Sequence, residues 1–163
     1  MKPGQGYAPI DMGGRVTELR LPADRDYIVV AKRSAAAVGS VAGFDMDAID
    51  DLTIAVAQAV ENAIGCLERS GVLTGQVRIA FKLGARGLEV NVRSTVSRDA
   101  EMEAQVRAQA ERARTGTEVQ QAEGEAAVDL ALRLMGLFVD DSSYRVDERT
   151  GGLRVRLTKY RVS

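Results

Sequence analysis

The stretch DDLTIAVAQAVENAIGC, residues 50–66, carries the polar side chains whose spacing most suggests chemistry. If it forms a helix with about 100° between successive residues, Asp51, Gln58 and Asn62 fall in one narrow row on its flank. A separate apolar stripe covers about one third of the circumference and comprises Leu52, Val56, Ala59, Val60, Ala63 and Leu67. The stripe predicts a buried face, and the polar row predicts a site whose oxygen atoms suit a metal and a nucleotide.

One member of this row, Gln58, restricts the chemistry. A side-chain amide can orient a water or a hydroxyl group by hydrogen bonding, but at neutral pH it does not accept a proton. The neighbouring carboxylate, Glu61, lies about 100° around the helix from Asn62. We therefore expect Glu61 to face away from the polar row and to add no carboxylate to it.

The sequence contains no histidine. This excludes a Ser–His–Asp triad, a zinc site built on histidine and a phosphohistidine intermediate. A general base in this protein would have to be a carboxylate or a lysine.

The composition is that of one domain. The chain has 163 residues, 45% of them hydrophobic, which is enough for a single sizeable core. A formal net charge of -1 gives no global attraction to nucleic acid or to an anionic membrane. The lone cysteine excludes an intramolecular disulfide, and no apolar run reaches the ~20 residues of a membrane span or resembles the core of a signal peptide. We expect a cytoplasmic protein that binds neither nucleic acid nor membrane directly.

Patterning divides the first half of the chain into a tail, a strand and two helices. Residues 1–14 are rich in glycine and proline and predict a mobile tail, and residues 15–22 predict a short edge strand. An Ala-rich helix that ends at Gly43 follows. A second helix is expected over about 46–69, because Asp45 supplies an N-cap.

The second half begins with a hairpin, because apolar residues alternate with polar ones in VRIAFKL and again in LEVNV. Residues 98–124 are mostly Ala, Glu, Arg and Gln and predict an exposed helix or a mobile loop. Residues 125–139 restore a helical apolar face, and residues 144–162 predict two strands joined by a Gly-Gly turn, the second a basic edge strand.

This order of elements predicts an α+β fold, a two-layer α/β sandwich with helices on one face of a mainly antiparallel sheet. A doubly wound sheet is not supported, because no series of strand, crossover helix and strand occurs. We expect a single domain over 15–163 that contains a variable charged segment at 98–124.

Three ordered pieces of sequence carry a family resemblance. They are LRLPADRDYIVVAKRSAAAV, then GFDMDAIDDLTIAVAQAVENAI, and finally LRLMGLFVDDSSYRV with GGLRVRLTKY. From about Arg15 to its end, the chain resembles the anti-sigma factor and serine-protein kinase family of bacteria, a branch of the histidine-kinase-like (GHKL) ATPases with the Bergerat ATP-binding fold. The second piece is the most specific, because it resembles the family's N-box helix, A-V-S-E-A-x-x-N-A-I.

The resemblance implies roles for the polar row. In the family, the Asn of this helix is a ligand of the Mg²⁺ that bridges the ATP phosphates, and Asn62 matches it. The Glu one turn earlier acts in the family as the base that activates the attacking hydroxyl, and Gln58 occupies that position. The resemblance therefore implies a retained magnesium ligand beside a catalytic position that has lost its carboxylate.

Other family motifs are altered as well. At the place of the family's Asp-x-Gly-x-Gly, which binds adenine, this chain reads VRSTVSRDA, with no glycine and with Asp99 five residues after Ser94. Leu153 replaces the Thr expected after the last Gly pair. Cys66 stands where many relatives have His, and a small buried hydrophobe is the simplest interpretation of it.

The phosphate-binding glycine box of the family is reduced to Gly124. In the family, backbone N–H groups of this box cradle phosphates at a helix N-terminus. The flanking Glu123 and Glu125 would repel a triphosphate. A simpler interpretation is that these two carboxylates form a favourable first turn of the last helix, where they stabilise its dipole.

These features favour a regulatory protein of the partner-switching type. It would bind a sigma factor or an anti-anti-sigma (STAS) protein, or both, while binding Mg-ATP weakly or not at all. The alternative is an active serine/threonine protein kinase that phosphorylates its anti-anti-sigma partner, with Asn62 binding Mg²⁺ and with an unrecognised base.

Further alternatives stay open at this stage. One is a stand-alone ATP-sensing module without sigma-factor binding or kinase activity. Gln58 and Asn62 can also be ordinary polar residues at a helix edge. The segment 98–124 is either a solvated stretch or a remodelled nucleotide lid or partner-docking arm. Dimers are common among the relatives, and the exposed first strand or first helix offers a surface for a homodimer.

Overall fold

The computed structural model describes residues 14–71, 74–96, 118–147 and 150–162, together with 102, 106, 109 and 110. Within this part of the chain, the side chains of residues 118–125 are not described. The predicted tail therefore lies almost wholly outside the described residues, as does most of the charged segment that precedes residue 118.

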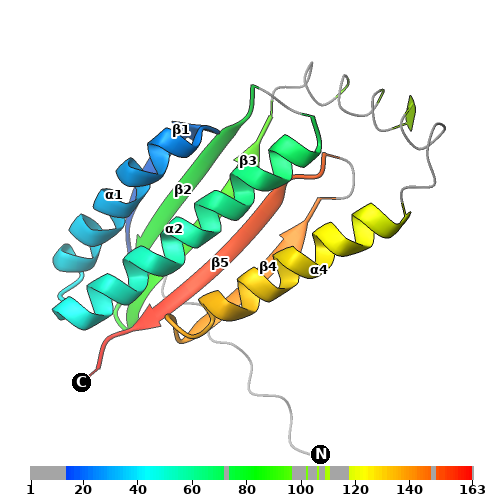
Figure 1. Cartoon of the computed structure of the whole chain (residues 1–163). Coiled ribbons are helices and arrows are strands. Elements are labelled where there is room, and N and C mark those ends of the chain that lie inside the picture. The colour runs from blue at the N-terminus through cyan, green and yellow to red at the C-terminus, as the bar shows by residue number, and fades with distance from the viewer. Residues whose placement is uncertain are drawn as a thin grey trace, which may run out of the picture.

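In the described part of the chain, three α-helices and five strands have assigned bounds, and Figure 1 shows their arrangement. In chain order they are β1 (Arg15–Pro22), a 3-10 turn η1 (Arg25–Tyr27), α1 (Ile28–Val41), α2 (Met46–Arg69), β2 (Gln76–Leu83), β3 (Gly87–Thr95), α4 (Glu118–Met135), β4 (Asp141–Val146) and β5 (Leu153–Tyr160). The strands form one sheet in the order β1-β2-β3-β5-β4, and every neighbouring pair is antiparallel.

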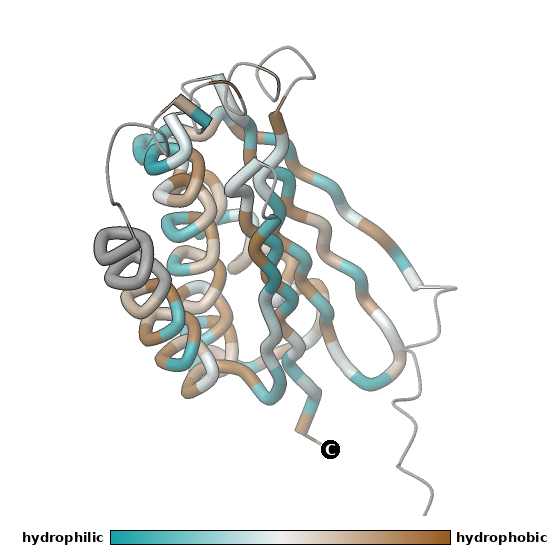
Figure 2. The backbone as a smooth tube through the Cα atoms, turned by 90° about the vertical axis from the view of Figure 1, so that its right-hand side faces the viewer, coloured by the Kyte–Doolittle hydropathy of each residue, from teal (hydrophilic) through white to brown (hydrophobic). Residues whose placement is uncertain are grey.

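The helices form one layer and the sheet forms the other. Figure 2 shows α1, α2 and α4 together on one side of the sheet. Apolar residues of β2, β3 and β5 pack against those of α2 in one continuous core that includes Val56, Ile64, Phe81, Val90 and Leu157. The predicted α+β two-layer sandwich is confirmed.

Helix α2 occupies the centre of the helical layer, and its sequence explains its position. Asp45 caps its first turn, because Oδ1 accepts a hydrogen bond of 2.8 Å from the N–H of Ala48. All six residues of the predicted apolar stripe are buried. Neither this 24-residue helix nor any other described helix has an apolar stretch long enough to cross a bilayer.

Small residues allow α1 to lie close beside α2. Ala31, Ala35 and Gly39 are the buried residues of α1. A methyl group at Gly39 would lie 3.2 Å from the Ile49 side chain and 3.4 Å from that of Leu52. The close approach places η1, directly before α1, against the flank of α2.

Two features of the C-terminal half differ from the sequence-based expectation. Helix α4 begins at Glu118, seven residues before the predicted start, because residues 118–124 favour helix although they add little apolar surface. The basic strand β5 is not an edge strand, since it lies between β3 and β4. The edge strands are β1, as predicted, and β4.

Candidate functional site

The polar row of α2 lies on the flank that faces β5. Lys159 of β5 donates a hydrogen bond from Nζ to Oδ2 of Asp51 over 3.2 Å. About three turns further along α2, Nδ2 of Asn62 donates to the backbone oxygen of Gln58 over 2.9 Å. The structure thus brings the three predicted site residues onto one helix flank.

Asn62 keeps the atom that a metal ion would use. Because its Nδ2 is bound to the helix backbone, Oδ1 is the side-chain atom left for another partner, and no described residue donates to it. The side chain is half-buried. A carbonyl oxygen held in this way on a helix is a suitable ligand for a hard cation.

Gln58 has no described carboxylate to act in its place. Its side chain is exposed and makes no hydrogen bond with a described residue. Glu61 is bound instead by Arg25 of η1, with 3.1 Å between Nη1 and Oε1. The same guanidinium binds Glu68 at 3.0 Å, and these two carboxylates, Glu68 most strongly, raise the pKa of Arg25. Glu61 therefore faces η1 and not the polar row, as predicted.

Asp51 takes part in a contact that connects three segments of the fold. The side chain of Lys159 is only 12% exposed, and its Nζ also donates to the backbone oxygen of Phe138 over 2.9 Å. The ammonium group therefore joins the first half of α2, the end of β5 and the chain after α4. Lys159 therefore anchors these three segments, and the partly exposed Asp51 neutralises its charge.

Ser94, at the end of β3, closes the sheet onto α2 beside Asn62. It is buried, and its Oγ donates to the backbone oxygen of Ala63 over 3.0 Å. The same hydroxyl accepts a hydrogen bond of 3.2 Å from the N–H of Leu153 in β5. One hydroxyl group thus links β3, α2 and β5, and both of its hydrogen bonds stay within the protein.

The turn before β5 packs against the C-terminal end of α2. Gly151 has a φ of +69°, and a Cβ built there would lie 1.9 Å from Oγ of Ser70. Leu153, two residues later, is 1% exposed and belongs to the core. The Gly-Gly turn therefore supports packing at this end of the helix.

Cys66 lies near the same end of α2 and is buried. Burial raises the pKa of its thiol, and Arg69, whose Nη2 lies 3.3 Å from Sγ, opposes this rise only in part. A protonated buried thiol is a poor nucleophile. The structure agrees with a packing role for Cys66.

Comparison with known proteins places this arrangement in a family. Residues 21–159, which contain all three helices with assigned bounds, strands β2, β3 and β4, nearly all of β5 and the last two residues of β1, match the histidine kinase-like ATPase domain. The chain belongs to this family.

Relatives of this histidine kinase-like ATPase domain include serine-protein kinases. It is 34% identical to the serine-protein kinase RsbW of Listeria innocua over 74 residues, which cover 45% of this chain and 46% of that protein. It is 28% identical to RsbW of Oceanobacillus iheyensis over 75 residues, 46% of this chain and 47% of the relative. With RsbW of Bacillus licheniformis the identity is 31% over the same shares. The chain spans about half the length of the curated relatives it matches.

A histidine kinase-like ATPase domain implies Mg-ATP, but the described residues do not fit a complete site for it. Asn62 offers one oxygen ligand, and no group of three or more Cys, Asp or Glu side chains among the described residues is placed to hold a metal. Gln58 provides no base. The hydroxyl of Ser94 is already bound at both sides by protein. No step of phosphate transfer follows from these residues.

The remaining predicted site residues do not complete the pocket. Gly124 lies in the second turn of α4, where backbone N–H groups are bonded within the helix and are not available to a phosphate. Asp99 lies outside the described residues. A phosphate cradle at this helix would have to use its first turn, which begins at Glu118.

Sequence reasoning did not find the partners that fix this region. Arg25 is 36 residues from Glu61, Lys159 is 108 residues from Asp51, and Ser94 is 31 residues from Ala63. No local periodicity connects residues so far apart. The alternation of β5 gives one indication, since it places Lys159 on the same face as the apolar residues of that strand.

Proposed function

We propose that this protein is a regulatory binding protein of the partner-switching type. It holds a sigma factor or a STAS-type anti-anti-sigma protein and binds Mg-ATP weakly or not at all. The observation that carries this proposal is the environment of Gln58, an exposed amide in the position of the family's base. Glu61, the carboxylate three residues later, is held by Arg25 at 3.1 Å.

The contacts of Ser94 support the same proposal. In the histidine kinase-like ATPases that this chain resembles, the matching place carries an Asp that accepts a hydrogen bond from adenine. Here a shorter side chain uses its hydroxyl to join Ala63 and Leu153. A site that has exchanged a ligand contact for an internal contact retains the fold and loses affinity for the nucleotide.

Calorimetric titration with ATP and with ADP in the presence of Mg²⁺ tests the nucleotide part. We expect no heat of binding and no thermal shift up to millimolar nucleotide. A ligand at 100 times its dissociation constant would stabilise the fold by about 2.7 kcal/mol, which a melting curve detects easily. Micromolar binding that disappears in Asn62→Ala would contradict this part of the proposal.

Co-purification tests the binding part. The tagged protein is expressed with each sigma factor and each STAS-domain protein encoded by the same genome, and complexes are isolated by size-exclusion chromatography. We expect a stable complex with at least one of them, formed equally by Asn62→Ala. If no candidate of either class binds, the regulatory role is wrong.

A second candidate is an active serine/threonine protein kinase that acts on its anti-anti-sigma partner. The RsbW relatives are serine-protein kinases, which favours this candidate, and so does the open Oδ1 of Asn62. This candidate predicts transfer of labelled phosphate from ATP to a STAS-domain protein, and loss of that transfer in Asn62→Ala. Partner binding without transfer separates the two candidates.

A further inference from the structure

The face of the sheet opposite the helices carries a row of five arginines. In the strand register, each of these arginines lies opposite the next one on the neighbouring strand. In order across the sheet they are Arg20, Arg78, Arg93, Arg154 and Arg145. This arginine row crosses every strand of the sheet, from β1 at one edge to β4 at the other.

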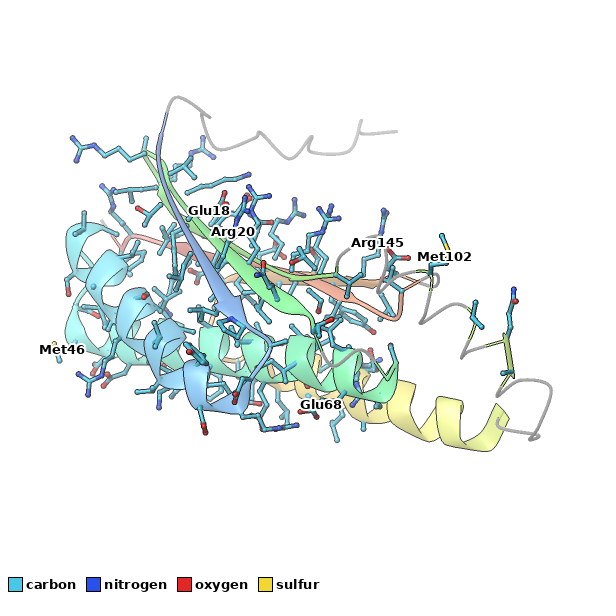
Figure 3. The ribbon with its side chains drawn as sticks, turned by 90° about the horizontal axis from the view of Figure 1, so that it is seen from above. Glu18, Arg20, Met46, Glu68, Met102 and Arg145 are labelled. Carbon is cyan, nitrogen blue, oxygen red and sulfur yellow. The ribbon has the colours of Figure 1, made fainter. Side chains whose placement is uncertain are left out.

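The strand alternation places the arginine row outside the core. Val77 and Ile79 flank Arg78 on β2, and both are completely buried beneath the helices. In Figure 3 the labelled Arg20 and Arg145 lie on the side of the sheet away from α2. All described helices lie on the opposite side (Figure 2), so no described element covers this face.

Carboxylates neutralise the arginines at one end of the row but not at the other. Glu18 of β1 forms ion pairs with Arg20, at 3.2 Å, and with Arg78. The other three members of the row are Arg93, Arg154 and Arg145; they are exposed and form no ion pair with any described residue. An unneutralised stretch therefore covers β3, β5 and β4.

This stretch weakens the isolated fold. Neighbouring strands are about 4.8 Å apart, and like charges directly opposite one another on a sheet are destabilising. The two long segments of which the structure describes little carry no net negative charge. Residues 1–13 contain one lysine and one aspartate, and residues 97–117 contain acidic and basic residues in equal number. A partner that supplies negative charge would remove the repulsion.

We propose that the arginine row is a docking surface for an acidic helix of a partner protein. Carboxylates one turn apart on a helix are separated by about 5.4 Å, close to the strand spacing of about 4.8 Å. A helix lying across the strands can therefore bring successive carboxylates to successive arginines. Guanidinium groups bind carboxylates through two parallel hydrogen bonds, which explains why arginine rather than lysine fills the row.

Other features of this face argue for a protein partner and against nucleic acid. Tyr160 is the only aromatic side chain that the described strands place there, so stacking platforms for bases are missing. A second copy of the chain in face-to-face contact would set one arginine row against another.

The test uses a defined probe. A synthetic alanine-based helical peptide with glutamate at every fourth position is titrated by fluorescence anisotropy at low salt, beside a peptide with glutamine at the same positions. We expect binding of the glutamate peptide only, with affinity that falls as salt increases. This proposal rests on the proposed binding role, but the two fail separately. If a partner co-purifies and the glutamate peptide does not bind, only the docking surface is wrong; if the peptide binds and no partner co-purifies, only the regulatory role is wrong.

Matched variants locate the binding surface. The row variant combines Arg93→Gln, Arg145→Gln and Arg154→Gln. The control variant removes the same charge from α1 and from the β2–β3 turn by Lys32→Gln, Arg33→Gln and Arg86→Gln. We expect at least about tenfold weaker binding for the row variant and less than about a twofold change for the control.

A third variant tests the direction of the effect. Glu18→Gln frees Arg20 and Arg78 from their ion pairs, and we expect it to tighten peptide binding by about two- to fivefold. The row variant should melt at the same temperature as the unaltered protein or higher, since it relieves repulsion. If it fails to fold, Glu18→Gln and the salt dependence still decide the outcome.

Three outcomes would overturn the proposal. One is equal loss of binding in the row and control variants. Another is tighter binding of a 20-base-pair DNA duplex than of the glutamate peptide under the same conditions. The third is concentration-dependent dimerisation, measured by light scattering, that the row variant abolishes.

Discussion

Arg25 holds the carboxylate of Glu61 at 3.1 Å, on the flank of α2 that faces η1. The residue that follows, Asn62, lies about 100° further around the helix, in the row with Gln58. The helix therefore separates its own carboxylate from the position where the family has a base. Two residues that are adjacent in the sequence therefore lie on different flanks of α2.

We predict that Gln58→Glu alone does not create phosphate transfer. The substitution restores a carboxylate beside Asn62, but the hydroxyl of Ser94 remains bound to α2 and β5. The measurement is transfer of labelled phosphate from ATP to a STAS-domain protein. Transfer by Gln58→Glu that disappears on adding Asn62→Ala would contradict the prediction and would show that the missing base is the only defect.

Ser94→Ala should lower the free energy of unfolding by about 1 to 3 kcal/mol. It removes the acceptor of the buried Leu153 N–H, and an unpaired buried donor costs about that amount. Urea denaturation measures the change. Thr95→Ala is the matched control, because Thr95 makes a 3.3 Å hydrogen bond at an exposed position. Equal losses in the two variants would show that the bridge made by Ser94 does not stabilise the fold.

Local sequence patterns were enough to predict α2 and the sheet. The N-cap at Asp45 and the apolar stripe fix where the helix begins and which face is buried, and the alternation around Phe81 and Val90 fixes two strands. Each of these signals depends on residues within about two helical turns or one strand. The polar row of α2 was predictable for the same reason, since helix geometry alone places Gln58 beside Asn62.

Contacts between distant parts of the chain were not predictable from such patterns. The basic strand β5 was expected at an edge because charges often protect edges, yet β4 takes the edge and β5 pairs with β3. The arginine row likewise depends on the register of four strand pairs. The anchors of the site, Arg25, Ser94 and Lys159, act on residues at least 31 positions away.

Lys159→Met should destabilise the protein more than Asp51→Asn. Methionine retains the apolar stem but leaves the Phe138 oxygen and Asp51 without their donor, so we expect a loss of about 1 to 3 kcal/mol. Asp51 is 42% exposed, and Asp51→Asn should cost no more than about 1 kcal/mol. Chemical denaturation of both single variants and the double variant measures these losses and their coupling. An equal loss of unfolding free energy in the two single variants would contradict the prediction. It would show that the hydrogen bond from Lys159 to the Phe138 oxygen adds nothing to the ion pair with Asp51.

Cys66 should react slowly with iodoacetamide in the folded protein, because burial raises the pKa of its thiol. At pH 8 we expect a lower alkylation rate than in urea, with the rate rising only at more alkaline pH. Arg69 opposes the shift, so Arg69→Gln should raise the pKa further and slow alkylation, while Arg86→Gln should not.

The same raised pKa gives the pH dependence of stability its direction. The folded state holds the thiol proton more tightly than the unfolded chain does, so this contribution to stability is complete below the unfolded pKa of about 9.0. It is lost as the pH rises through the higher pKa of the folded state. Cys66→Ala should therefore reduce the alkaline loss of stability, measured as the free energy of unfolding between pH 7 and about pH 10. A folded thiol that reacts as fast as the unfolded one would show that Cys66 is accessible and would disprove both expectations.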